Sequence, residues 1–192
     1  MKKQKISILL SLLFVSTLFL FTQCGSKSDL PRGEERVTIL CGGPEYRSDS
    51  EYFRANNSAD SPNMANSKRM ALSNARAELA GQMEVTVKAV IDNYFQDVAI
   101  GDMQEFQQRY EGMSREVINQ KLTGTRIICE EVTRTPEGRY RTYVAIELSG
   151  NEILNAMNER ISRDDRLRLD YDRERFRNDF DEEMRNFERD RY

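Results

Sequence analysis

Residues 139–148 read RYRTYVAIEL, and their alternation of apolar and polar side chains is the clearest indication of the fold. Successive side chains of a strand point to opposite faces, so one apolar row forms along it: Tyr140, Thr142, Val144, Ile146 and Leu148. A turn sequence, TPEG at 135–138, comes before it, and residues 125–133 also have strand character. The pattern predicts an antiparallel hairpin with one buried face, which a further element must cover.

The region from Ser61 to about Ile100 is the expected cover. Ser61 and Pro62 suit the N-cap and the first position of a helix. Gly81 weakens this long helix by about 1 kcal/mol relative to alanine. The apolar residues of the helix recur at helical spacing: Leu72, Leu79, Met83, Val87, Val90, Tyr94 and Val98.

Other segments have shorter patterns. Residues 103–120 predict a second helix, with an apolar stripe made of Phe106, Tyr110, Met113 and Val117. Residues 36–41 alternate around Val37 and Ile39, which indicates a short strand, and residues 52–55 indicate another. We expect residues 56–63 to form a loop.

Residues 151–192 predict a long, highly charged helix. Between Glu159 and Tyr192 there are ten arginines and twelve acidic residues, with no lysine, glycine or proline. The helix also has a narrow apolar stripe. In the simpler interpretation the stripe packs on the chain's own domain or the helix is mostly solvated; in the alternative the stripe docks on an envelope protein or a second copy. The stripe is our candidate partner-docking surface: Leu169, Phe176, Phe180, Met184 and Phe187.

The N-terminal segment has the layout of an export signal. Lysines stand at positions 2, 3 and 5, and residues 6–21 form an uncharged apolar run. Sixteen residues span about 24 Å as a helix, less than the ~30 Å of a bilayer core. The run ends at FTQCG, residues 21–25, which resembles the lipobox of bacterial lipoproteins. That resemblance implies cleavage before Cys24 and acylation of its thiol; a simple signal peptide or uncleaved anchor is the alternative.

Several expectations follow from this resemblance. Residues 1–23 are the signal peptide, and residues 24–35 form a polar tether that includes Pro31 and Gly33. Two or more acyl chains, such as diacylglyceryl and palmitate, anchor a protein stably in a membrane. Gly25 is not the aspartate that retains such lipoproteins at the inner membrane, so an outer-membrane location in the cell envelope is favoured.

Two further cysteines, Cys41 and Cys129, can be free thiols or a disulfide. The apolar neighbours of Cys129 favour a buried free thiol. Outside the cytoplasm a disulfide between them is permitted, and it would close a loop of about 90 residues. No histidine or closely spaced cysteine accompanies them, so a zinc site is not expected.

The helix sequence RMALSNARAELA at residues 69–80, followed later by the hairpin, resembles the LPP-twenty family of bacterial lipoproteins. The similarity extends from Tyr52 to Leu148. It implies an α+β domain over residues 36–150, a long helix on a small antiparallel sheet that is somewhat dodecin-like, with no established enzyme activity. The charged C-terminal residues resemble an extension found in envelope lipoproteins of the Bacteroides type.

Composition narrows the function classes. The chain has no histidine, which removes the usual acid–base group and the commonest metal ligand. Its 29 basic and 32 acidic residues are nearly balanced, which argues against nucleic-acid binding. Glu130 and Glu131 fall on opposite faces of a strand and do not form a catalytic pair. We therefore predict a lipid-anchored envelope protein with a structural or interaction role and no cofactor or metal. A periplasmic small-ligand binding module is the alternative, and an enzyme is a third.

Overall fold

The computed structural model describes residues 34–35, 37–96, 103–169 and 171–189. Contacts divide the chain into residues 1–37 and residues 38–192. The predicted signal peptide, Cys24 and all but the end of the tether lie outside the described residues. The second unit is built from one short 3-10 helix, three strands and four helices, which run in this order: η2 (Pro44–Tyr46), β1 (Tyr52–Ser61), α2 (Met64–Gln96), α3 (Met103–Leu122), β2 (Arg126–Arg134), β3 (Tyr140–Ser149), α4 (Gly150–Arg163) and α5 (Arg173–Arg189).

The fold is α+β, as the sequence predicts, with a three-stranded antiparallel sheet in the order β1-β3-β2. The hairpin of β2 and β3 is confirmed. Its turn closes through a hydrogen bond from the Thr135 N–H to the Arg139 carbonyl at 2.8 Å, and Gly138 has a φ of 79°, a conformation that favours glycine. The register of β2 shifts between Ile127 and Cys129, the mark of a β-bulge.

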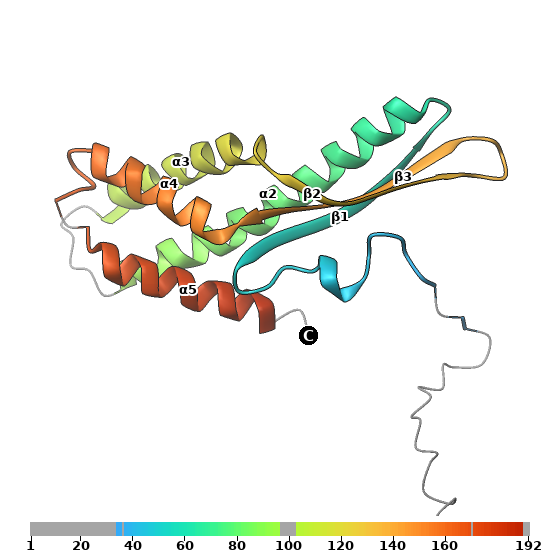
Figure 1. The fold of residues 1–192 in the computed structure, drawn as a ribbon. Helices are drawn as coiled ribbons and strands as arrows, with labels where there is room; N and C mark the ends of the chain where they lie inside the picture. The colour runs from blue at the N-terminus through green and yellow to red at the C-terminus, as the bar shows by residue number, and fades with distance from the viewer. Residues whose placement is uncertain (1–33, 36, 97–102, 170, 190–192) are drawn as a thin grey trace, which may run out of the picture. The chain divides into compact units, whose positions relative to one another are not determined.

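Helix α2 covers one face of the sheet, as expected (Figure 1). The residues that contact the sheet most closely are small: Ala71 and Ala75 are fully buried, and the Ser67 hydroxyl lies 2.8 Å from the Thr142 hydroxyl. Leu72, which we expected to begin the buried stripe, is only half-buried. The reason is that only small side chains fit between the backbones of a helix and a sheet that lie this close together. The larger Leu72 therefore lies beside the contact and not in it.

The rest of the predicted α2 stripe is buried from Leu79 to Tyr94, whereas Val98 lies outside the described residues. The predicted helix start is wrong by two positions. Ser61 ends β1, and Asn63 caps α2 by accepting the Asn66 N–H on its side-chain oxygen at 3.1 Å. Gly81 lies inside an unbroken helix.

Helices α3 and α5 pack against α2, and α4 packs against α3 and α5 (Figure 1). Tyr110 and Val117 of the α3 stripe are buried, and Phe106 and Met113 pack against the same core. An aromatic cluster joins the helices, with ring centroids 5.1–6.4 Å apart: Tyr94, Phe95, Tyr110, Tyr171 and Phe176.

The single helix predicted for residues 151–192 is wrong. It is interrupted between Arg163 and Arg173, where two aspartates cap backbone groups. Asp164 accepts the N–H of Leu167 at 3.1 Å, and Asp172 accepts the N–H of Arg175 at 3.0 Å. This interruption turns the chain back, so α4 and α5 share one hydrophobic core with α2 rather than forming a separate extension.

Two strand predictions also need correction. Residues 37–39 are not a strand, and Val37 is exposed. Strand β1 instead extends through residues 56–61, which we expected to be a loop. The polar sequence NNSAD has weak strand propensity, but every one of these residues pairs with β3, where Asn56 lies opposite Ala145 and Asp60 opposite Arg141.

Candidate functional site

Residues 38–51 lie against part of the outer face of the sheet, the face away from α2. Glu147 and Ala145 of β3 point to this face, yet only 5% and 0% of their surfaces are exposed. We expected β3 to have one buried face, so the burial of these two residues on the other face is a finding of the structure; further along the same face, Tyr143 is half-buried and Arg141 is exposed. Segment 38–51 is therefore the feature of the described chain that calls for a functional explanation.

A disulfide between Cys41 and Cys129 attaches segment 38–51 to the sheet. Cys129 lies opposite Ala145 in the register, so its side chain points to the outer face, and Cys41 is buried against it. Of the two alternatives that the sequence left open, the structure contains the disulfide. Closing a loop across 88 positions restricts the unfolded chain far more than the folded one.

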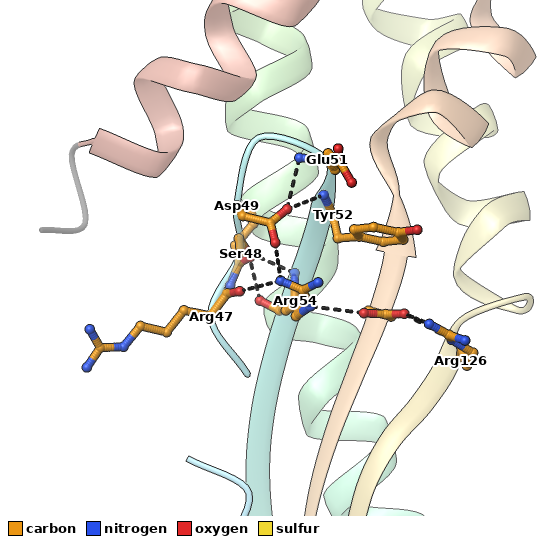
Figure 2. A network of polar contacts seen from close by, with 9 residues as sticks. Arg47, Ser48, Asp49, Glu51, Tyr52, Arg54 and Arg126 are labelled. Atoms are coloured by element: carbon orange, nitrogen blue, oxygen red, sulfur yellow. Dashed lines mark hydrogen bonds and ion pairs between the residues drawn. The ribbon is translucent and has the colours of Figure 1, made fainter. Parts of the chain in front are cut away.

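Ser48 and Asp49 attach the other end of the segment to the first residues of β1 (Figure 2). The Ser48 hydroxyl accepts the Arg54 N–H at 2.7 Å, and it lies 2.9 Å from the Arg54 carbonyl and 3.1 Å from the side-chain oxygen of Gln82. Asp49 accepts the backbone N–H of Tyr52 at 2.8 Å. These contacts satisfy backbone groups of an edge strand, which would otherwise be available for pairing.

Arg54, Glu147 and Arg126 lie opposite one another in the register and form a charged row across the three strands; Figure 2 labels the two arginines. The Glu147 carboxylate accepts hydrogen bonds from Arg54 Nε and Arg126 Nε, both at 2.9 Å. The Arg54 guanidinium also donates to the carboxylate of Asp49 and, at 2.9 Å, to the Arg47 carbonyl. The row thus joins segment 38–51 to all three strands.

The electrostatics of this row favour a fixed charge. Burial opposes ionisation of Glu147, but the hydrogen bonds and charges of Arg126 and Arg54 outweigh it and hold the pKa of this carboxyl below its ordinary value. The same opposing effects lower the pKa of Asp49, with Arg54 as the stabilising cation. A carboxylate that stays ionised and has both oxygens occupied is a poor proton donor or acceptor near neutral pH. The geometry suits positioning of the chain more than catalysis.

A hollow of about 510 Å³ lies beside the row and is lined in part by Tyr52, Arg126 and Glu152. Two further hollows, of about 420 and 480 Å³, lie between α3 and α4 and share Arg160 and Arg163. Arg160 lies 3.3 Å from Glu116, and Arg163 is bonded to Glu159. Their charges are therefore already balanced within the chain.

The structure does not leave the predicted docking stripe available to a partner. Phe176, Phe180 and Met184 are buried in the chain's own core, and the ring of Phe187 lies 5.9 Å from that of Phe53. Only Leu169 is exposed, at 76%. The residues of the stripe that lie in α5 contact other parts of the chain: Phe176 packs against Tyr94 and Tyr110, and Phe187 against Phe53, which is why these positions are apolar.

Glu130 and Glu131 lie opposite Val144 and Tyr143, on different faces of the sheet, as predicted. Lys68 of α2 lies 2.7 Å from Glu130. Sequence reasoning missed the row of Arg54, Glu147 and Arg126. The available signal was a glutamate inside the apolar run VAIEL at residues 144–148, since a carboxylate there requires a cationic partner.

Among the described residues, no group of three acidic or cysteine side chains could hold a metal ion. No helix in this part of the chain is long and apolar enough to cross a membrane. The sequence matches no protein-family model and no curated protein.

Proposed function

We propose that this protein is a lipid-anchored component of the bacterial cell envelope, with a structural or protein-interaction role and no catalytic activity. The observation that carries the proposal is the Cys41–Cys129 disulfide. Disulfides persist mainly outside the cytoplasm. The bond therefore supports export independently of the lipobox-like sequence around Cys24.

The use of polar groups in the folded domain also supports this role. The most buried carboxylate, Glu147, is neutralised by two arginines that join strands, and Asp49 holds backbone N–H groups. These groups have their hydrogen-bonding capacity filled by the protein itself. A module whose buried polar groups are occupied in this way is suited to a structural role more than to catalysis.

The small-ligand alternative requires an apolar pocket between the long helix and the sheet. Fully buried side chains fill this interface instead, among them Leu79, Phe53 and Ile146. Partner binding by this protein would therefore use exposed surfaces rather than the helix–sheet interface or the buried residues of the predicted docking stripe.

Mass spectrometry of the N-terminal peptide tests the lipid anchor. We expect the peptide to begin at Cys24 and to carry a diacylglyceryl group and an amide-linked acyl chain. A Cys24→Ala variant is expected to lose the modification and leave the membrane fraction, whereas Ser26→Ala, a matched change two residues away, is expected to behave as wild type. An unmodified thiol at Cys24 in protein that fractionates with the soluble contents would refute the proposal.

Thiol counting tests export separately. Alkylation of the denatured protein without reductant is expected to label neither Cys41 nor Cys129, and labelling after reduction is expected at both. Equal labelling with and without reductant contradicts the disulfide and removes the main support for export.

A further inference from the structure

A turn in segment 38–51 exposes two large aliphatic side chains. The Gly42 N–H donates to the Ile39 carbonyl at 3.1 Å, and Cys41 has a φ of 54°. This turn directs Cys41 inward to its disulfide, while Ile39 and Leu40 remain 59% and 40% exposed. The disulfide at the next position fixes the turn on the sheet, so the two side chains are presented in a set arrangement.

The hollow beside this turn differs from the others described above. It has a volume of about 240 Å³, and its walls are Ile39, Leu40, Tyr143 and the polar, uncharged residues 56–58. The three hollows described above have charged side chains in their walls, and so does a fourth, of about 180 Å³, which is lined in part by Glu84 and Lys88. Removing charges from water is expensive, whereas aliphatic groups beside a tyrosine suit a membrane–water boundary.

The short separation in sequence between the turn and Cys24 limits how far the turn can lie from an anchoring lipid surface. Ile39 follows the predicted acylation site, Cys24, by 39 − 24 = 15 positions. Fifteen residues span at most about 50 Å when fully extended. A lipid surface that holds Cys24 would therefore always be within reach of the turn, and tethering raises the effective concentration of a weak contact.

We propose that Ile39 and Leu40, together with Tyr143, form a membrane-contact surface that rests on the lipid layer in which the protein is anchored. This inference depends on the lipid anchor of the proposed function for its tethering. It gives the anchored domain a defined orientation, with the outer face of the sheet toward the lipid headgroups and α2 away from them.

Tryptophan fluorescence offers a direct test, because the chain contains no tryptophan. The acylated protein carrying Ile39→Trp is reconstituted into vesicles of phosphatidylethanolamine and phosphatidylglycerol with brominated acyl chains. We expect the emission to shift to the blue and to be quenched by about half or more, since interfacial side chains reach the acyl boundary. The control is Leu169→Trp in the α4–α5 connection, which lies far from segment 38–51 in Figure 1 and should be quenched little.

Two further arms separate the surface from the anchor. Leu40→Glu in the Ile39→Trp background is expected to reduce the quenching, because it places a charge at the contact. Equal quenching of Ile39→Trp and Leu169→Trp in protein whose acylation is verified by mass would overturn the membrane-contact surface and leave the anchor intact. If Cys24 is unmodified, the anchor fails; unacylated Ile39→Trp is then added to excess brominated vesicles, where quenching supports the surface and its absence overturns it.

Discussion

Removal of the Cys41–Cys129 disulfide is the most informative perturbation of the folded domain. The chain-entropy relation for a loop closed across 88 positions gives a stabilisation of about 4–5 kcal/mol at 25 °C. The folded domain retains its other connections between segment 38–51 and β1, notably those of Ser48 and Asp49. We therefore expect the variant Cys41→Ala/Cys129→Ala to fold but to lose about this amount of unfolding free energy.

Urea denaturation followed by circular dichroism measures this loss. The comparison is made in a Cys24→Ala background, so that lipid does not complicate refolding. With a slope near 2 kcal/mol/M, the midpoint should fall by about 2 M. Dithiothreitol should lower the midpoint of the disulfide-containing protein similarly and leave that of the double variant unchanged. A loss below about 1 kcal/mol, or a response of the double variant to dithiothreitol, would contradict a stabilising disulfide between Cys41 and Cys129.

Three further predictions address the charged row, two glycines in helices and the predicted docking stripe. Glu147→Gln removes a carboxylate that accepts hydrogen bonds from two arginines, but Arg126 is largely exposed and Arg54 keeps its ion pair with Asp49. Stability at pH 7, measured by urea denaturation, should therefore fall by about 1–3 kcal/mol. Because the folded pKa of Glu147 lies below its ordinary value of 4.5, its contribution is present above that pH and is lost as the pH falls through the folded value. The wild type should therefore lose more stability than Glu147→Gln on acidification below about pH 4.5, and parallel pH profiles would contradict this. Gly81→Ala meets open space inside α2 and should raise stability by about 0.5–1 kcal/mol. Gly150→Ala should bring no such gain, because its methyl group would lie 3.1 Å from Met184 Cε and 3.4 Å from Phe180 Cε1, so a neighbouring side chain must shift. Thermal melts in which both variants gain equally would contradict the packing around Gly150. Phe180→Ala should lower the free energy of unfolding by about 3–5 kcal/mol and Leu169→Ala by less than about 0.5 kcal/mol, because Phe180 is buried and Leu169 is exposed. Equal small effects in urea denaturation would show that Phe180 is not buried.

Sequence periodicity predicted the elements whose burial pattern is regular over many residues. The hairpin follows from alternation in β3, and α2 and α3 follow from apolar residues at helical spacing. It failed for residues 56–61, because a polar edge strand is formed by the unpaired backbone of β3 and not by its own side chains. Periodicity also failed at the break before α5. Asp164 and Asp172 act as helix caps because the packing of both α4 and α5 on the common core requires the chain to reverse its direction between them.

The candidate site was less accessible to sequence reasoning. The two cysteines were identified, but their pairing was left open, because the distance between Cys41 and Cys129 depends on how segment 38–51 crosses the sheet. The partners of Glu147 lie 93 and 21 positions away in the sequence. No local pattern connects such residues.

From the amino-acid sequence we could predict α2, α3, the hairpin and the α+β class, because hydrophobic spacing reports local geometry. The sequence also supplied the expectation of an N-terminal anchor at Cys24. The packing of distant segments settled three other features: Phe176, Phe180 and Met184 lie in the core, segment 38–51 lies against part of the outer face, and Ile39 and Leu40 remain exposed. The physical reason is that burial depends on which distant surfaces meet, and an apolar side chain has the same local pattern whether its own chain or another surface covers it.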